Sequence, residues 1–477
     1  MSKHRAGGQI LPLFVLAMVV ILALGSLLVD GASALVTRRR LQNVGDAASL
    51  AGANALQATG SGRVCSTVST DPPGAPRQDI VDAVMASLAT NWPAITAGDV
   101  TITCPPGWEN QAVRVDLRLN SATFISGAIG MSPPSVGTTS IAVNGQLTGS
   151  GYSVVLLDPG NPGWPNGRRG CPAFLISGGP TLLFDGSVYV NSACSAGDGG
   201  ALATNGNSAT VTLASDRAIR VVGGYDPGPL TISPTPMTGA TRLDDPLAGL
   251  EPMSTAGMTV RSSARLVLNN ETQVLLPGVY RGGIQLRNSS VALLRPGIYV
   301  FDGGGLDVGA QASFCSINAT STATTCATFD TDCPDTTCGV LLYNQGTASG
   351  GGAMGQLTVG AGATLKLRAY DDRANADEHF EYRNLLIWQG ASPVPTSSYA
   401  QPIVQLSGGG NVDISGTVYA PSAKVLMGGN SGGTGGGSVE LLLQFICWDL
   451  EMSGNSAFHY FYSDSETTKW KDYGLVQ

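Results

Sequence analysis

The pattern of apolar and polar positions divides the chain into a helical N-terminal segment and a long β-rich remainder. Residues 10–29 form an uninterrupted run without a charged side chain. As a helix, such a run rises about 30 Å, which matches the hydrocarbon thickness of a bilayer. The helical pattern continues without proline to Ala58, in residues that favour helix. It predicts one helix of about fifty residues whose first part spans a membrane.

A cleaved signal peptide is the alternative interpretation of this run. Lys3 and Arg5 would form its basic start, and Ala32, Ser33 and Ala34 would supply its cleavage site. The apolar run is longer than the roughly 7 to 15 residues usual in signal peptides. The length therefore favours a retained transmembrane helix, while cleavage stays open.

Residues 60–150 have the pattern of a small α+β head. The segment 79–90 places Ile80, Val81, Val84 and Leu88 on one face of a short helix. Apolar and polar residues then alternate over 100–104 and 112–120, as they do in half-buried strands, and a third strand is expected at 139–143. We expect the head to end near residues 149–151.

Beyond this point short apolar strands recur between glycine-rich turns. The clearest repeat relates Leu276-Pro277-Gly278-Val279-Tyr280 to Arg295-Pro296-Gly297-Ile298-Tyr299, 19 residues later. A period near 20 residues with very short strands is typical of coiled β-sheets. We therefore predict a right-handed parallel β-helix over about 165–463, with the aromatic segment 458–462 capping its last coil. A β-sandwich or a propeller is the alternative.

These patterns define a mainly β chain in three parts. Residues 1–59 comprise a cytoplasmic stub, the transmembrane helix and its extension. Residues 60–150 form the α+β head, and residues 151–477 the β-helix-like repeat domain with a terminal cap.

Composition narrows the class of protein. Charged residues make up 13% of the chain, about half of the roughly 25% found in ordinary domains. Glycine accounts for 64 of the 477 residues, close to twice its usual share of about 7%. An ordinary soluble helical enzyme is therefore disfavoured. The net charge of −8, without a basic cluster, also disfavours nucleic acid as a partner.

The cysteines indicate an oxidising compartment. They are scattered through glycine- and serine-rich loops and lack the paired spacing of zinc sites. We expect Cys65 to pair with Cys104 and Cys171 with Cys194, and the buried Cys447 to remain a thiol. Three connectivities stay open for the cluster of Cys315, Cys326, Cys333 and Cys338.

Small residues form a smooth stripe on the second half of the predicted helix, at Ala47, Ala48, Ala51, Gly52 and Ala55. Such a stripe permits close approach of another helix. Two interpretations remain open: docking on a partner helix, or packing on the chain's own next domain.

The first sixty residues combine a Gly8-Gln9 start, an apolar span ending in Val29-Asp30-Gly31, and the run RRRLQNVGDAASLAGANAL. In these features they resemble the TadG-like proteins of bacterial Flp/Tad pilus-assembly systems. It implies a bitopic inner-membrane protein with a cytoplasmic N-terminus and its bulk in the periplasm or outside the cell.

Two departures limit what the resemblance implies. Many relatives carry a von Willebrand A domain with an Asp-x-Ser-x-Ser metal site, whereas here the strand 153–157 is followed by Asp158-Pro159-Gly160-Asn161-Pro162. No metal or cofactor is therefore expected. The fifth residue after Gly8 is Leu13, where pilins have Glu, which disfavours a polymerising pilin.

A catalytic role has one candidate segment. The sequence YDDRANADEHFEYR gathers charged residues, namely Asp371, Asp372, Arg373, Asp377, Glu378, His379, Glu381 and Arg383. We favour a solvated loop, because no matching carboxylate pair recurs on neighbouring repeats, as a glycosidase would require.

We therefore expect a non-catalytic envelope protein of pilus assembly or surface attachment. Its expected partners are the bilayer and Flp/Tad pilus-assembly proteins, and glycan or peptidoglycan is a further candidate. The alternative is a membrane-tethered, polysaccharide-active enzyme of the β-helical type.

Overall fold

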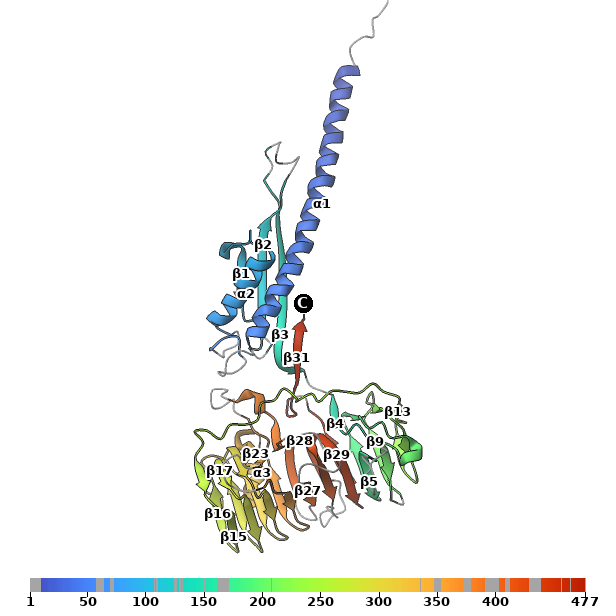
Figure 1. Cartoon of the computed structure of the whole chain (residues 1–477), viewed down its shortest axis with the longest axis vertical. Helices are drawn as coiled ribbons and strands as arrows, with labels where there is room; N and C mark the ends of the chain where they lie inside the picture. The colour runs from blue at the N-terminus through green and yellow to red at the C-terminus, as the bar shows by residue number, and fades with distance from the viewer. Residues whose placement is uncertain are drawn as a thin grey trace, which may run out of the picture. The chain divides into compact units, whose positions relative to one another are not determined.

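The chain forms two compact units, each described here by itself. The computed structural model describes residues 10–476 except 57–63, 69–72, 107, 109, 124–126, 128–129, 131, 149–150, 161–170, 207, 335, 347–352, 372–378, 391–402, 408–411, 429–438, 456 and 464. Unit 1 comprises Met1–Leu147 with Lys471–Gln477, and unit 2 comprises Thr148–Trp470. Unit 2 is therefore inserted, in sequence, near the end of unit 1 (Figure 1).

Unit 1 combines a long helix with an antiparallel sheet. Its elements are α1 (Ile10–Ala55), α2 (Gln78–Asn91), η1 (Ala97–Asp99), β1 (Val100–Thr103), β2 (Ala112–Asn120), β3 (Ser135–Thr148) and β31 (Trp470–Leu475). The strand order is β1-β2-β3-β31, so a C-terminal strand completes a sheet that the N-terminal part begins. The β1–β2 and β2–β3 pairings are antiparallel. The 46 residues of α1 confirm the long helix expected from the sequence.

The core of unit 1 lies between the sheet and the second half of α1. On β2, Val113, Val115 and Leu117 are fully buried, whereas Arg114 and Asp116 are half-buried and Arg118 is exposed. The apolar β2 residues cluster with Leu41, Val44 and Ala48 of α1 and with Ile80, Val84 and Leu88 of α2. The alternation predicted for this strand thus selects the face that meets the helices.

Unit 2 contains two runs of short strands. The first run is β4 (Tyr152–Leu156), β5 (Phe174–Gly178), β6 (Thr181–Phe184), β7 (Ser187–Val190), β8 (Leu202–Thr204), β9 (Thr210–Leu213), β10 (Ile219–Val221), β11 (Tyr225–Asp226), β12 (Thr231–Ser233) and β13 (Met237–Thr238), with η3 (Ala196–Asp198) between β7 and β8.

The second run is β14 (Val260–Ser262), β15 (Leu266–Asn269), β16 (Thr272–Leu275), β17 (Gly278–Arg281), β18 (Ile284–Arg287), β19 (Val291–Leu294), β20 (Gly297–Asp302), β21 (Leu306–Val308), β22 (Ser313–Ser316), β23 (Val340–Gln345), β24 (Leu357–Val359), β25 (Thr364–Leu367), β26 (Leu385–Gln389), β27 (Val404–Ser407), β28 (Val412–Gly428), β29 (Val439–Gly454) and β30 (Ala457–Phe461). Short helical turns interrupt it at η4 (Cys326–Thr328), α3 (Phe329–Asp332), η5 (Thr336–Cys338) and η7 (Phe380–Tyr382).

Strands of unit 2 pair with the strand three places further along the chain. Thus β14 pairs with β17, β17 with β20 and β20 with β23, and the same spacing links β15 to β18 and β16 to β19. These pairings are parallel. The chain therefore makes successive turns of three strands, which lie one upon the next. The long strands β28 and β29 each serve three strand positions of a turn.

The turns do not stack in the order of the sequence. The last strands, β29 and β30, pair in parallel with the first ones, β4, β5 and β6. Along one face the order in space is β14-β17-β20-β23-β26-β28-β29-β4-β7-β10-β13. The chain thus enters unit 2 in the middle of the stack, runs to one end, and restarts at the opposite end. We call the contact of β29 and β30 with β4, β5 and β6 the seam.

Residues 239–259 connect the two ends of the stack, and we call this segment the strap. Ten inter-strand steps of about 4.8 Å separate β13 from β14, or about 48 Å. Twenty-one residues can reach about 70 Å when extended, so the strap has length to spare for its turns. Figure 1 shows it running along unit 2 from β13 towards β17.

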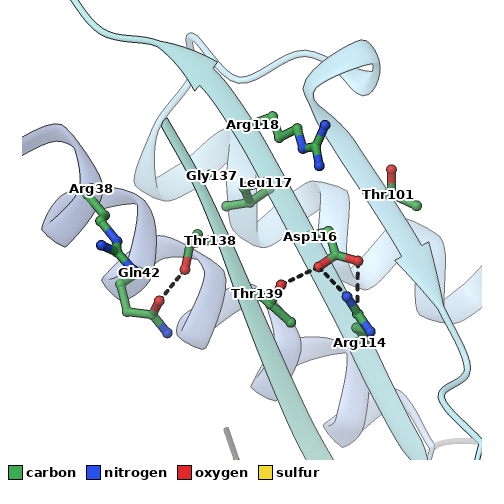
Figure 2. Close-up of a pocket in the computed structure, with 10 residues that line it drawn as sticks. All are labelled: Arg38, Gln42, Thr101, Arg114, Asp116, Leu117, Arg118, Gly137, Thr138 and Thr139. Carbon is green, nitrogen blue, oxygen red and sulfur yellow. Dashed lines mark hydrogen bonds and ion pairs between the residues drawn. The ribbon is translucent and has the colours of Figure 1, made fainter. Parts of the chain in front are cut away.

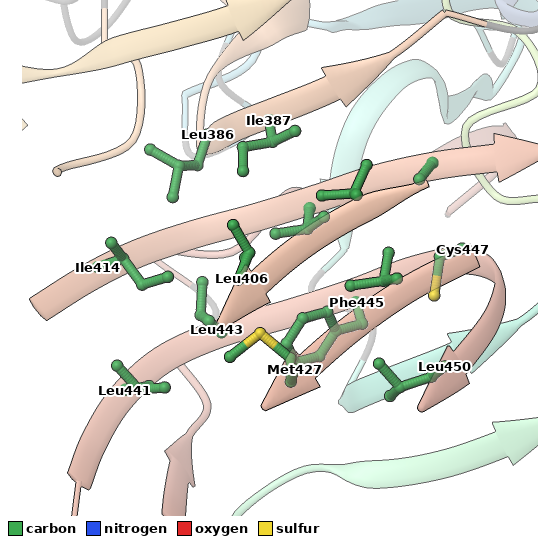
Figure 3. Packing of buried hydrophobic residues seen from close by; sticks show 14 of the residues in the cluster. Leu386, Ile387, Leu406, Ile414, Met427, Leu441, Leu443, Phe445, Cys447 and Leu450 are labelled. Carbon is green, nitrogen blue, oxygen red and sulfur yellow. The ribbon is translucent and has the colours of Figure 1, made fainter. Parts of the chain in front are cut away.

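The interior of unit 2 is one continuous apolar cluster. It runs from Leu268 and Leu275 near one end, through Phe445 and Tyr460 at the seam, to Val221 near the other. Figure 3 shows its middle, where side chains of β26 to β29 interleave. At the seam the rings of Phe184 and Tyr460 stack with centroids 4.9 Å apart, so the first and last turns share one core.

Glycine is required where backbones of adjacent turns approach closely. Gly283 has φ +76°, and a Cβ at this position would lie 2.0 Å from the carbonyl oxygen of Gly305. Gly305 has φ +67°, and a Cβ at this position would lie 2.1 Å from the carbonyl oxygen of Gln356. Any side chain there would collide with main chain, which explains the glycine steps of the repeats.

The mainly β fold with parallel pairing agrees with the sequence expectation. Two observations differ in detail from what the sequence suggested. The segment expected to cap the last coil contains β30, which pairs with β29 on one side and β6 on the other. Among the residues that the structure describes, no helix has the length and apolar character needed to cross a membrane.

Candidate functional sites

The small-residue stripe of α1 lies partly inside unit 1. Ala48 is fully buried, and a Cβ on Gly52 would lie 2.8 Å from a methyl carbon of Val84 in α2. Ala47, Ala51 and Ala55 are half-buried. Glycine at position 52 thus allows α2 to approach α1.

The first part of α1 exposes large apolar side chains. Leu13, Leu16 and Ile21 are 73%, 69% and 68% exposed, and Leu28 is 73% exposed. These positions point in different directions around the helix. Water would therefore meet apolar surface on more than one face of this segment.

The charged segment considered for catalysis is only partly described. Asp372, Arg373, Asp377 and Glu378 lie outside the described residues. His379 Nδ1 lies 3.8 Å from Glu381 Oε1, and its ring lies 5.7 Å from that of Tyr382. Asp371 and Arg383 also have interaction partners. The described part of the segment is thus held by contacts within the fold.

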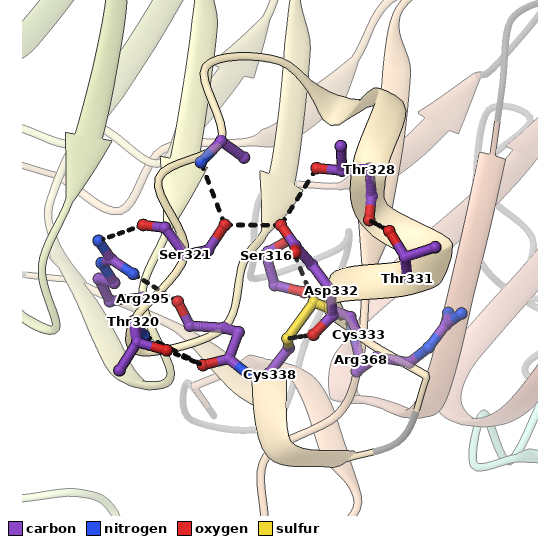
Figure 4. Close-up of a disulfide and its surroundings, with 12 residues drawn as sticks. Arg295, Ser316, Thr320, Ser321, Thr328, Thr331, Asp332, Cys333, Cys338 and Arg368 are labelled. Atoms are coloured by element: carbon purple, nitrogen blue, oxygen red, sulfur yellow. Dashed lines mark hydrogen bonds between the residues drawn. A yellow bond between two sulfur atoms is a disulfide. The ribbon is translucent and has the colours of Figure 1, made fainter.

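Four disulfides lie in the described structure. They join Cys65 to Cys104, Cys171 to Cys194, Cys315 to Cys326 and Cys333 to Cys338, and Cys447 is a buried free thiol. The first two pairings are those expected from the sequence, and the last two select one of the three open connectivities. Figure 4 shows the surroundings of the Cys333–Cys338 disulfide, where the carboxylate of Asp332 accepts hydrogen bonds from the hydroxyl groups of Ser321 and Thr328.

Two buried carboxyl groups meet at the seam. Asp158 follows β4 and is 1% exposed, and Asp449 lies in β29 and is 2% exposed. The side chain of Asp449 hydrogen-bonds that of Asp158, whose Oδ1 also accepts the amide of Gly160 at 2.8 Å. Burial raises the pKa of Asp158 above its ordinary value. A raised pKa favours the protonated form of Asp158, which lessens the repulsion between the two carboxyl groups.

The strap lies against a row of aromatic side chains. Tyr419 Oη donates to Asp245 Oδ2 at 2.8 Å, and Tyr189 Oη donates to the carbonyl of Thr241. Leu247 and Leu250 are 2% and 7% exposed in a cluster that also holds Trp388. Burial raises the pKa of Asp245, which favours a protonated carboxyl at this contact.

An open pocket of about 690 Å³ lies in unit 1. Arg38 and Gln42 of α1 line one side, and the β-sheet lines the other (Figure 2). On the sheet side, Arg114 makes a two-pronged ion pair with Asp116, at 2.9 and 3.1 Å. Thr139 donates to the same carboxylate at 2.5 Å. The remaining basic group of the sheet side is Arg118.

Sequence reasoning missed the seam, the strap contacts and this pocket. Each joins residues far apart in the chain, for example Asp158 with Asp449, and a single sequence carries no signal for such pairs. The sequence of the strap gave a weak indication of its packing. Apolar residues recur at 243, 247, 250 and 253, in a segment that lacks the alternation of a strand. Within the described residues, no group of three potential metal ligands comes together.

Comparison with known proteins gives one match. Residues 8–55 match the family model described as "Putative Flp pilus-assembly TadE/G-like". The match covers the segment on which the sequence resemblance rested, so that resemblance is confirmed. No curated protein and no solved structure matches the chain. The matched domain associates the chain with Flp/Tad pilus assembly and suggests a cell-envelope protein.

Proposed function

We propose that the chain is a non-catalytic, single-pass envelope protein that contributes to Flp/Tad pilus assembly or surface attachment. Its N-terminus would lie in the cytoplasm, and unit 2 would be presented in the periplasm or outside the cell. The observation that carries the proposal is the TadE/G-like match over residues 8–55.

Membrane anchoring is supported by the exposed apolar surface at the start of α1. The uncharged run of residues 10–29 has the length of a hydrocarbon core. Its side chains at positions 13, 16 and 21 are each more than two-thirds exposed. Lipid would cover a helix that is apolar on several faces, whereas water would not favour it.

A right-handed parallel β-helix is our proposal for unit 2. It is supported by the parallel pairings with a three-strand spacing, by the continuous interior cluster and by the glycine contacts between turns. The alternatives, a β-sandwich and a propeller, are built mainly from antiparallel strands. Parallel pairing throughout β4 to β30 therefore disfavours both.

Placement outside the cytoplasm is supported by the disulfides. Both units contain them, with Cys65–Cys104 in unit 1 and the other three in unit 2. Such bonds persist in oxidising compartments and are rare in the cytoplasm.

The absence of catalysis is also a proposal. Glycosidases require two carboxyl groups that a sugar can reach, whereas the adjacent carboxyl pair at the seam is 1% and 2% exposed. We propose that unit 2 instead offers a weakly charged surface to pilus-assembly proteins, glycan or peptidoglycan.

The anchoring proposal is tested by charge insertion into α1. In the native bacterium, Leu16→Arg combined with Val20→Arg should move the protein out of the carbonate-resistant membrane fraction and reduce pili per cell. Each arginine opposes insertion at a helix centre by about 2.5 to 3.5 kcal/mol. Both positions are exposed, at 69% and 49%, so the fold of unit 1 should survive.

The matched control is Leu35→Arg, which changes an equally apolar, 63% exposed position on the same helix beyond the predicted span. It should leave fractionation and pili unchanged. If the double variant keeps both wild-type membrane association and piliation, the proposal is wrong.

A further inference from the structure

The pocket of unit 1 carries uncompensated positive charge. Its lining holds three arginines and one aspartate, Asp116. Asp116 accepts two hydrogen bonds from the guanidinium group of Arg114, so its negative charge compensates that of Arg114. Among the residues that the structure describes, Arg38 and Arg118 have no ion pair, and both are exposed. The pocket therefore has a net charge of about +2 and two guanidinium groups available to an anion.

Arg38 and Arg118 approach the pocket from different elements. Arg38 is on α1, and Arg118 is on β2 at a position opposite Gly137 of β3. Figure 2 shows them at separate edges of the pocket, with Arg114 and Asp116 further along β2. Thr101 adds a hydroxyl group to the lining, whereas the hydroxyl of Thr138 donates to Gln42 Oε1. Planar guanidinium groups and hydroxyls are the side-chain groups that bind phosphate oxygens.

The pocket lies near the end of the proposed membrane span. Arg38 follows Val29 by nine residues, or about 14 Å of helix. Headgroup layers extend roughly 5 to 8 Å beyond the hydrocarbon, and a long arginine side chain can reach back several ångströms further. Arg118 lies at the same end of the sheet, since the loop after β2 accepts a hydrogen bond from Ser33 Oγ through the carbonyl of Ala122, at 3.3 Å.

We propose that this pocket binds the headgroup of an anionic phospholipid, with Arg38 and Arg118 contacting it from the two edges of the pocket. The proposal rests on the membrane anchoring proposed above. It assigns unit 1 a preference for anionic over zwitterionic lipid.

The test uses the full chain in a neutral detergent, titrated separately with phosphatidylglycerol, phosphatidylcholine and inorganic phosphate. Native mass spectrometry counts the bound molecules. We expect one phosphatidylglycerol to bind in preference to the other two. Arg38→Gln combined with Arg118→Gln should weaken this binding about 30-fold, since each arginine near a membrane surface contributes about 1 kcal/mol.

The matched control is Arg220→Gln combined with Arg287→Gln, which removes two exposed arginines of unit 2 and should leave binding unchanged. Equal binding of the two lipids, an unchanged affinity of the double pocket variant, or inorganic phosphate binding as tightly as phosphatidylglycerol would each overturn the proposal. Circular dichroism checks that the variants fold.

Carbonate extraction of the wild-type protein separates this proposal from the one on which it rests. Release of the wild-type protein by carbonate contradicts the anchoring itself. Retention in the membrane without a preference for phosphatidylglycerol contradicts only the pocket assignment.

Discussion

Buried carboxyl groups lie at two places where parts of unit 2 that are distant in sequence meet. Asp158 and Asp449 share the seam, and Asp245 of the strap accepts the hydroxyl of Tyr419. Burial raises the pKa values of Asp158 and Asp245. A carboxyl group that is harder to ionise in the folded protein stabilises it at low pH, and this stabilisation is lost as the pH rises through the raised pKa.

Replacing Asp158 tests this reasoning. Wild-type protein should lose unfolding free energy as the pH rises above about 4, because the folded state holds the proton more tightly. The charged groups that act on Asp158 are Asp449 and Arg242, and the Cys447 thiol interacts with Asp449. Asp158→Asn cannot ionise, so its loss should be smaller, by about 1.4 kcal/mol for each unit by which the pKa is raised.

Urea denaturation across this pH range measures the difference. Asp216→Asn is the control, since Asp216 has a positive φ that asparagine tolerates and a 78% exposed side chain. Identical pH dependence of wild type and Asp158→Asn would show that the pKa of Asp158 is not raised in the folded protein.

Much of the element-level fold could be predicted from the sequence. Residues 112–120 alternate strictly, and β2 has the predicted bounds and faces. The repeat at 276–280 and 295–299 was also informative: Tyr280 and Tyr299 each donate to the carbonyl four residues earlier, at 2.7 Å. Yet Gly278 lies opposite Tyr299 rather than Gly297, because periodicity gives the turn length and not the register.

The strap is an element held mainly by side-chain packing and side-chain hydrogen bonds rather than by strand pairing. Leu247 is 2% exposed among the aromatic residues of the stack. Leu247→Ala should therefore lower the unfolding free energy of unit 2 by about 2 to 5 kcal/mol. Leu276→Ala, at a 45% exposed leucine of the same unit, should change it by no more than about 0.5 kcal/mol. Equal effects in urea denaturation would contradict a packed strap.

At the scale of the whole molecule, the sequence could not reveal the order of the turns. Patterns along the chain identify strands, but the pairing of β29 with β4 joins positions such as Phe445 and Val154. The candidate pocket was hidden for the same reason, since Arg38 and Arg118 line one pocket only because α1 packs on the sheet. Contacts at such separations follow from the global fold and not from local preference.

The stack also determines what a cut in the strap would do. Cleavage between Ala248 and Gly249 would give two fragments without a disulfide between them, because every disulfide of the described structure lies within one fragment. The seam and the stacked rings of Phe184 and Tyr460 would still join them. Both residues at the cut are exposed, so a protease should reach an engineered site there.

The most direct test of the account is protease access to that engineered site in cells whose plasma membrane is sealed and whose outer layers have been removed. We predict that added protease cuts the strap without lysis, and that the two fragments remain together in a native gel and separate in denaturant. Cleavage only after lysis would contradict the placement of unit 2 outside the cytoplasm.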